Sequence, residues 1–517
     1  MGAGSPDFIG VDPDQLQAMT GDLAASAGAA QSLLNRYRPA LAQLGLDTSA
    51  LNAIGHHLSW ALDQVPMLNR VQELARQLAR QRPGPAGAGS PMVQLAASLV
   101  PLTSHPVHRD SVIPPGDGPP FPPAGVNMND PAAVTHWWDG LTQDEKKQLA
   151  NRYPQQIGSL DGVPSAVRDY CNRQELATLR EQTQNQLDQL KNHEPPAADR
   201  YGHQQWQQQV SDLQQKLDAM NKLASDLGPG PATGPGGTVV APGYGPDGFP
   251  LSDIPPDNFS AKEPQYFLLG IDTGGTGHVI VAAGNPDAAH NVVTMVPGVG
   301  SGLNNTAANW PTDISKGFVN SARGKGGQPT ATVYWDNYDA PASVPAALPR
   351  DPAEAGAPKL DQFLRGLRAS HNPSDSPHTV LIGHSYGSTV VGEAAKAAGG
   401  LGKLGVNDVI VIGSPGTDLG NAKQFGVAPG HVWAARVTND VIQASEGFHG
   451  TDPVLPDFGA HVFDAGTSPG DVFAAHGYYF DPRSPGMSNM VNIIDGSGPV
   501  TSPRYPPPPP PPPPYTT

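Results

Sequence analysis

Apolar residues follow two different spacings along the chain. Up to about residue 228 they recur every three or four positions, as on one face of a helix. From about residue 259 onward they gather into short runs, separated by Gly-rich or helix-forming segments. The sequence therefore predicts a helical N-terminal part followed by an α/β part.

The second part contains eight short apolar runs that are typical of buried strands. The first two are too close for a helix between them, so we expect an antiparallel hairpin turned by the glycine-rich residues 274–277. The later runs are far enough apart for crossover helices, which predicts parallel strands and a mostly parallel eight-stranded sheet of the α/β class. The predicted strands are 266–271, 278–283, 291–296, 330–335, 379–382, 408–412, 432–437 and 461–463.

The first part reads as helical regions joined by linkers rich in Pro and Gly. Thr142 and Glu145 match a capping box, and Asn129 or Asp130 caps the helix before it. The second arm of a predicted hairpin, 206–227, carries a coiled-coil-like apolar seam. We expect a helical bundle at 1–82, a linker at 83–126, a helical region at 127–228, a linker at 229–258, the α/β domain at 259–498 and a proline-rich tail at 499–517.

One hypothesis for these helices concerns export. Helical hairpins exported by type VII systems carry a Trp-x-Gly turn followed by Tyr-x-x-x-Asp/Glu. Trp138 and Gly140 match the first pattern, but Tyr153 is followed four residues later by Ile157, so the pair is incomplete. A structural bundle, whose helices could bind a protein partner, is the simpler interpretation.

Charge and composition exclude several classes of partner. The net charge is −16 over 517 residues, which argues against nucleic acid or an anionic membrane as the main partner. The single cysteine, Cys171, excludes an internal disulfide, and we expect it in the core. No apolar run reaches the ~18 residues of a membrane span, and residues 1–8 lack a signal-peptide pattern. We expect a cytoplasmic protein, or one exported without a signal peptide.

The stretch 378–398 carries the strongest chemical signal. It reads as a short strand, a Gly-His-Ser-Tyr-Gly turn and a helix of small residues, which is the nucleophile-elbow pattern with Ser385 at its tip. Gly383 and Gly387 are expected to supply backbone freedom and room at this turn. A second match places Ser468 before Pro469, which has no N–H to donate to an oxyanion, so we reject it.

A serine nucleophile needs a base, and an acid that orients the base. In this arrangement the acid and then the histidine follow the serine along the chain. Asp440 leaves the carboxyl end of the seventh predicted strand and is the favoured acid, with Asp418 as the alternative. His476, after the eighth strand, is the favoured base, and His449 is second.

Two other histidines and one loop complete this part of the prediction. His431 and His461 stand at the start of the seventh and eighth strands, so we expect them at the wrong end of the sheet. An oxyanion needs two backbone donors, and the N–H of Tyr386 is one candidate. The loop after the third strand, with Gly298, Val299 and Gly300, is expected to supply the other, with the N–H of Val299 as first choice. The alternative is a Gly-rich turn without a catalytic part.

Several segments are distinctive in combination: VYWDNYDAP, VLIGHSYGSTVVG, VIVIGSPG, residues 449–460, and the upstream WWDGL and IGSLDGVPSAVRDYCNR. Together, over roughly residues 127–494, they resemble an actinobacterial α/β-hydrolase family that is catalogued as a domain of unknown function. The resemblance implies the α/β-hydrolase fold, with Ser385, Asp440 and His476 in the triad positions. It does not supply a substrate.

These features predict a serine hydrolase that cleaves an ester or thioester, in the manner of an esterase or lipase, through an acyl-enzyme on Ser385. No ligand spacing for a metal and no cofactor motif is found, so we expect neither. The expected partner is a small-molecule or lipid ester. The alternative is a hydrolase scaffold that has lost catalysis and acts as a binding or type VII secretion-associated protein. The apolar faces of 127–228 have to be buried, and the surface near the active-site mouth is the nearest candidate for this cap or docking element.

Overall fold

The structure, a computed structural model, describes residues 119–196, 200–228, 230, 243–253, 264–303, 311–325, 327–445, 448–470, 472–496 and 500–501. By its internal contacts the chain divides into Met1–Ser111 and Val112–Thr517, and every described residue belongs to the second unit. The predicted bundle at 1–82, most of the linker at 83–126, more than half of the linker at 229–258, and the proline run lie outside the described residues.

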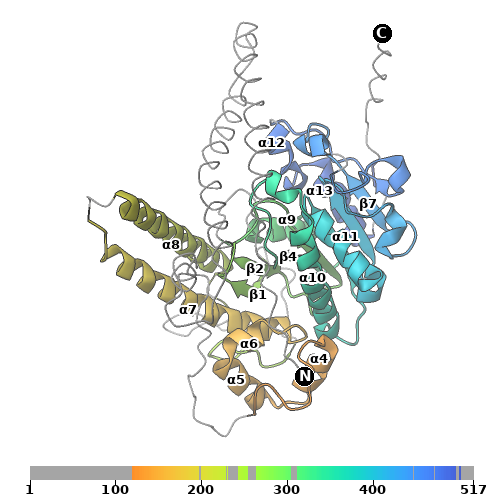
Figure 1. Ribbon diagram of the computed structural model, residues 1–517. Helices are drawn as coiled ribbons and strands as arrows, with labels where there is room; N and C mark the ends of the chain where they lie inside the picture. Colours follow the sequence, from red (N-terminus) through yellow and green to blue (C-terminus); the bar gives the residue numbers. More distant parts are fainter. Residues whose placement is uncertain are drawn as a thin grey trace, which may run out of the picture. The chain divides into compact units, whose positions relative to one another are not determined.

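Five helices precede the sheet in the described part of the chain (Figure 1). Asp130 caps the first of them by accepting a hydrogen bond from the N–H of Ala132 at 3.1 Å. Thr142 and Glu145 form the predicted capping box of the second. These helices are α4 (Pro131–Asp139), α5 (Gln143–Arg152), α6 (Pro154–Gly158), α7 (Ser165–Lys191) and α8 (Arg200–Leu227).

The eight predicted strands form one sheet, and their ends differ from the prediction by at most two residues. The strand order is β1-β2-β4-β3-β5-β6-β7-β8. β1 and β2 form the expected antiparallel hairpin, β2 also pairs antiparallel with β4, and the other neighbours are parallel. The strands are β1 (Tyr266–Asp272), β2 (His278–Ala283), β3 (Asn291–Val296), β4 (Thr330–Asp336), β5 (His378–His384), β6 (Asp408–Ile412), β7 (Val432–Ala435) and β8 (His461–Val462).

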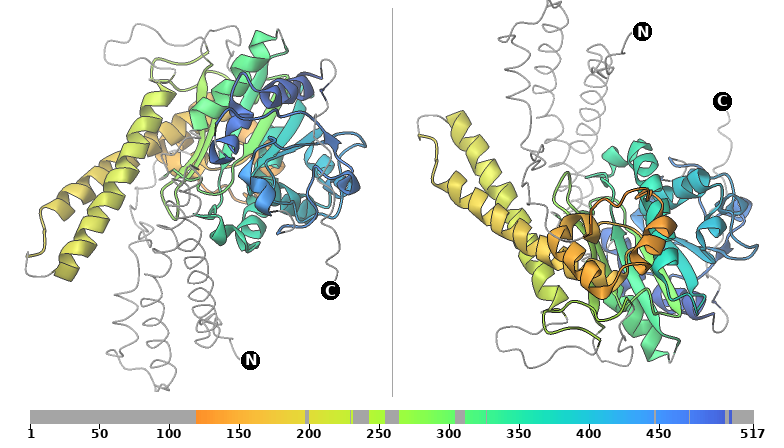
Figure 2. Two further views of the ribbon diagram at one scale, coloured as in Figure 1. Left: turned by 90° about the horizontal axis from the view of Figure 1, so that it is seen from above. Right: turned by 90° about the horizontal axis from the view of Figure 1, so that it is seen from below.

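Helices cover both faces of the sheet (Figure 2). Apolar side chains alternate along β5: Leu381 packs in the cluster with α10 (Asp351–Ser370) and α11 (Gly387–Ala398). Val380 and Ile382 pack on the opposite face, in the cluster that contains α9 (Pro311–Gly324) and α13 (Pro485–Asp495). This alternation follows from the two-residue period of a strand, and it gives a three-layer α/β domain. A short helix, α12 (Val472–Ala475), leads into the region of His476.

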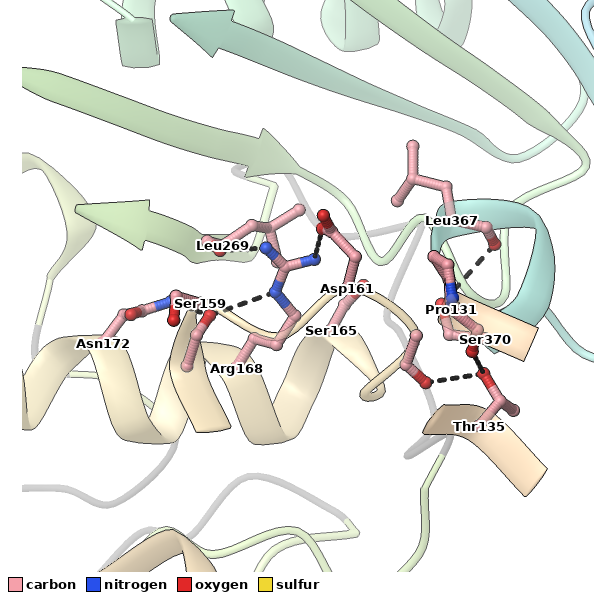
Figure 3. A network of polar contacts seen from close by, with 12 residues as sticks. Pro131, Thr135, Ser159, Asp161, Ser165, Arg168, Asn172, Leu269, Leu367 and Ser370 are labelled. Carbon is pink, nitrogen blue, oxygen red and sulfur yellow. Dashed lines mark hydrogen bonds and ion pairs between the residues drawn. The ribbon is translucent and has the colours of Figure 1, made fainter. Parts of the chain in front are cut away.

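The helical region closes the open edge of the sheet at β1 (Figure 3). Arg168 Nη2 of α7 donates to the carbonyl of Leu269 at 2.7 Å, and Asn172 Nδ2 donates to the carbonyl of Leu268 at 2.9 Å. The carboxylate of Asp169 accepts from the N–H of Leu268 at 2.7 Å. An edge strand leaves such groups unpaired, and covering them prevents pairing with another chain. Side chains of α7 thus take the place of a further strand.

The inner end of α8 packs beside the same edge. Its Met220, Leu223 and Leu227 lie in one apolar cluster with β1 and β2. That cluster also contains Val279 and Leu303, which line the large pocket described below.

Cys171 is buried and free, as predicted for a core residue. Within the described residues, no helix combines the length and apolar content that crossing a membrane requires.

Candidate active site

Ser385 lies at the turn between β5 and α11. Its φ angle is +55°, in the left-handed region that residues other than glycine rarely adopt. The turn is held because Ser385 N–H donates to the carbonyl of Ile412 at 3.0 Å, and Ser388 N–H donates to the carbonyl of Ser385 at 3.0 Å. The backbone strain therefore falls on the predicted nucleophile, at the carboxyl end of a central strand.

The two glycines of the turn supply room, as predicted, but not backbone freedom. Neither Gly383 nor Gly387 has a positive φ angle. A methyl carbon placed on Gly383 would lie 2.6 Å from Cα of Ser388, and one placed on Gly387 would lie 2.6 Å from the carbonyl oxygen of Pro297. Close backbone approach, rather than unusual dihedral angles, is what excludes a side chain here; the expectation of backbone freedom was wrong, because Ser385 itself takes the left-handed conformation.

His476 and Asp440 form a hydrogen-bonded pair. His476 Nδ1 lies 2.9 Å from Oδ1 and 3.1 Å from Oδ2 of Asp440, whose side chain is buried. Tyr479 donates its hydroxyl proton to Oδ2 of Asp440 at 2.6 Å, and the N–H of Ile442 donates to Oδ1 at 2.9 Å. Burial alone would raise the pKa of Asp440, but these bonds and the nearby His476 outweigh it and hold the pKa below its usual value. The carboxylate is thereby kept ionised beside the imidazole.

Two residues that sequence reasoning missed support this pair. A methyl carbon on Gly413, whose φ angle is +53°, would lie 3.2 Å from both Oδ2 of Asp440 and Cε1 of His476. His384 donates from Nε2 to the carbonyl of His476 at 2.9 Å, and the two rings are 4.8 Å apart. Burial, together with the charge of His476, lowers the pKa of His384 to about 3, so its ring stays neutral. The only sequence feature that could have pointed to His384 was its place inside the Gly-His-Ser-Tyr-Gly turn.

The loop after β3 approaches the serine closely. A methyl carbon on Gly298 would lie 2.6 Å from Cβ and 2.9 Å from Oγ of Ser385, and 2.9 Å from the backbone N of Tyr386. Val299 and Gly300 line the same pocket. The structure therefore brings Gly298 and the backbone N of Tyr386 next to Oγ of Ser385, while Val299 and Gly300 are placed only as residues that line the same pocket.

Residues that follow β4 hold this loop. Tyr338 donates its hydroxyl proton to the carbonyl of Pro297 at 2.8 Å, and the N–H of Gly300 donates to the carbonyl of Pro341 at 2.8 Å. Asp336, which ends β4, accepts from the hydroxyl of Ser301 at 3.0 Å. Burial raises the pKa of Asp336 to about 7, against the effect of its hydrogen bonds.

The alternative acid and base lie next to each other. His449 Nδ1 is 3.5 Å from Oδ2 of Asp418, and Arg350 Nε is 3.1 Å from Oδ1. His449 Nε2 donates to the carbonyl of Ala347 at 2.7 Å, although the residue also lines the pocket. The nitrogen that a base would turn toward the serine is thus engaged elsewhere.

The two rejected histidines lie at the amino ends of parallel strands, away from Ser385. His431 precedes β7, with its Nδ1 3.0 Å from Oδ1 of Asp408 at the start of β6. His461 opens β8 and packs its ring against Trp433. Both positions agree with the prediction, because the carboxyl ends of parallel strands meet at one edge of the sheet.

A pocket of about 640 Å³ joins these groups. Ser385, Tyr386 and His476 line it together with the loop at 298–300. Most of its other walls are apolar side chains from the sheet, from α9 and from the loops that follow β4 and β7. Its size and lining are those of a site for a small, largely apolar molecule.

The sequence resembles that of known α/β hydrolases. A family model described as "Alpha/beta hydrolase" matches residues 272–449. An uncharacterized protein of Mycobacterium bovis is 30% identical over 250 residues, which are 46% of this chain and 82% of that protein. An uncharacterized protein of Mycobacterium tuberculosis is 27% identical over 411 residues, 73% of this chain and 57% of its own length, so the chain spans little more than half of that relative. Among solved structures, an esterase of Pyrobaculum calidifontis has a TM-score of 0.28 at 12% identity, over 43% of this chain and 81% of the esterase.

Proposed function

The chain belongs to a family of alpha/beta hydrolases that includes uncharacterized mycobacterial proteins, and from this premise we propose that it is a serine hydrolase that cleaves a carboxylic ester or thioester. One observation carries the proposal: Asp440 holds Nδ1 of His476 at 2.9 Å, while His476 lines the pocket of the strained Ser385. This leaves Nε2 of His476 as the nitrogen that can accept the proton of Ser385.

The proposed reaction runs through an acyl-enzyme. Ser385 Oγ attacks the carbonyl carbon of the substrate, and its proton passes to Nε2 of His476. Asp440 stabilises the imidazolium through Nδ1–H. The oxyanion accepts hydrogen bonds from the N–H of Tyr386 and from an N–H of the loop after β3, with Val299 as first choice. The predicted donor Gly300 is excluded, because its N–H already donates to the carbonyl of Pro341.

The leaving group and then a water complete the cycle. The tetrahedral intermediate collapses, and the alcohol or thiol leaves with the proton that His476 carries. His476 next takes a proton from water, and the resulting hydroxide attacks the acyl carbon. The acid is released, and the proton returns to Oγ of Ser385. An ester or thioester fits better than a peptide, because the apolar walls of the pocket offer no charged group for a basic or acidic peptide side chain beyond Asp336.

Labelling by a fluorophosphonate probe, together with hydrolysis of p-nitrophenyl acetate, tests this proposal. Ser385→Ala should lose the label and at least about 10³-fold in kcat, and His476→Ala should lose a similar factor, since the three groups act as a unit. Ser468→Ala is the matched control, because Ser468 shares the local sequence pattern but no role, and it should keep both signals. A wild-type protein that neither labels nor hydrolyses would contradict the proposal and favour the scaffold without catalysis. Loss of activity in His449→Ala but not in His476→Ala would move the base to His449.

A further inference from the structure

Large apolar side chains stand in solvent around the mouth of the pocket. Val344 and Leu348, after β4, are 67% and 50% exposed. Val441 and Phe448, after β7, are 36% and 54% exposed. All four line the pocket that contains Ser385. We call these four residues the apolar rim.

The clustering of these side chains is specific to the pocket. In the described part of the chain only two further large apolar residues are exposed, Leu251 and Leu455, and neither lines the pocket. Single exposed apolar residues are ordinary, but a group of them around a cavity marks a surface that binds apolar material. Two separate loops supply the rim, so the exposure is not the consequence of one poorly packed segment.

The interior continues the apolar surface of the rim. Met295, Leu303 and Ile314 are almost fully buried, and they line the pocket with the half-buried Ile442. Apart from the polar groups beside Ser385, the main polar side chain in the pocket wall is Asp336, whose carboxylate accepts a hydrogen bond from the hydroxyl of Ser301. A chain of methylene groups would therefore find apolar contacts from the mouth to the interior, and each buried methylene contributes about 0.8 kcal/mol.

We propose that the substrate is a long-chain acyl ester taken from a lipid surface without net charge, with the acyl chain in the pocket and the apolar rim inserted in the surface; this rests on the proposed serine hydrolase function. Four uncharged side chains cannot recognise a charged head group. The net charge of −16 in addition opposes approach to an anionic membrane. A neutral or zwitterionic lipid surface is thus the occupant that matches both the rim and the charge.

A series of p-nitrophenyl esters from acetate to palmitate tests the substrate class. With the full chain and monomeric esters, kcat/KM should rise about fourfold for each added methylene over the first several, which is the 0.8 kcal/mol of its burial converted to a rate. A kcat/KM that stays flat or falls from acetate onward overturns the acyl-chain proposal. Continued hydrolysis of acetate and labelling by fluorophosphonate would in that case leave the serine hydrolase function standing, so the two failures can be told apart.

The double variant Leu348→Ser and Phe448→Ser tests the rim, with Leu455→Ser as the matched control because Leu455, at 44% exposed, is comparably exposed but lies outside the pocket. Wild type and control should sediment with phosphatidylcholine vesicles, and the double variant should not. Its ratio of palmitate to acetate hydrolysis should fall at least about tenfold, while its melting temperature stays that of the control.

Three outcomes overturn this part. The wild type could fail to bind phosphatidylcholine vesicles, or bind only vesicles that contain phosphatidylserine. The double variant could bind as well as the control. Finally, light scattering could show that the wild type is an oligomer and the double variant a monomer, which would assign the rim to contact between copies of the chain.

Discussion

His384, the residue directly before Ser385, donates a hydrogen bond from Nε2 to the backbone carbonyl of His476 at 2.9 Å. The bond ties the end of β5 to the segment that carries the proposed base. Burial, together with the charge of His476, lowers the pKa of His384 to about 3, so the ring donates from Nε2 as a neutral imidazole. The residue next to the proposed nucleophile thus contacts the segment that carries the proposed base.

His384→Phe should change how the stability of the protein depends on pH. In the folded protein the ring binds its proton only near pH 3, whereas in the unfolded chain it does so near pH 6.5. Between these values the unfolded state binds more protons, so the free energy of unfolding falls as pH falls. From pH 6.5 to 4.5 this contribution is on the order of 2 kcal/mol. The variant should lack it, and urea unfolding at the two pH values measures the difference.

The exposed His136 provides the control for this prediction. His136→Phe should show the same pH dependence as the wild type, because the buried carboxyl groups titrate alike in both proteins. If His384→Phe loses as much stability on acidification as His136→Phe does, then His384 is not held neutral by its surroundings. The loss of the bond to His476 should also lower kcat by roughly tenfold.

The strands and the elbow were predictable because each is a local pattern. A buried strand such as β6 is a short apolar run with sharp ends, and the run 408–412 coincides with β6 (Asp408–Ile412). The Gly-His-Ser-Tyr-Gly turn needs particular residues at fixed spacing, because Gly383 and Gly387 leave no room for a side chain. Such constraints are visible within a few residues of each other.

The supporting contacts were not predictable from local patterns. Gly413 lies against Asp440 and His476, and nothing in its neighbourhood in the sequence connects it with them. Arg168 and Leu269 are 101 residues apart, and their contact joins a charged side chain to a backbone carbonyl. Hydrophobic periodicity locates apolar faces and gives no information on which polar groups of a helix will meet the edge of a sheet. Arg168, Asp169 and Asn172 are buried, yet hydrophobic periodicity would place these polar residues on a helix face exposed to solvent.

Gly298→Ala should strongly impair catalysis. The added methyl group would lie 2.6 Å from Cβ of Ser385 and 2.9 Å from the N of Tyr386, so either the loop or the serine has to move. Losing one oxyanion donor costs about 10²–10³ in kcat, which is the size of effect we expect on p-nitrophenyl acetate. Gly317→Ala in α9 is the control, because its methyl group meets only Cε of Met487 at 3.8 Å. Equal activity of the two variants would show that the loop at 298–300 takes no part in catalysis.

Arg168→Ala should destabilise the protein at the edge of the sheet. The side chain is 4% exposed, and its guanidinium bonds the carbonyls of Gly158 and Leu269 and the carboxylate of Asp161 (Figure 3). Removing it leaves a buried carboxylate and two carbonyls without these partners, which costs about 3–5 kcal/mol in the free energy of unfolding.

Arg365→Ala on α10 is the matched control for the loss of an arginine. Arg365 is 50% exposed and pairs with Asp361 one turn away, so its removal should cost no more than about 1 kcal/mol. Urea unfolding compares the two variants, and light scattering reports whether the uncovered β1 edge leads Arg168→Ala to associate. If both variants lose the same small amount of stability and stay monomeric, then α7 only lies beside the sheet and does not close it. A large loss in Arg168→Ala alone would make the upstream helices a necessary part of the hydrolase fold, because among the described strands only β2 pairs with β1.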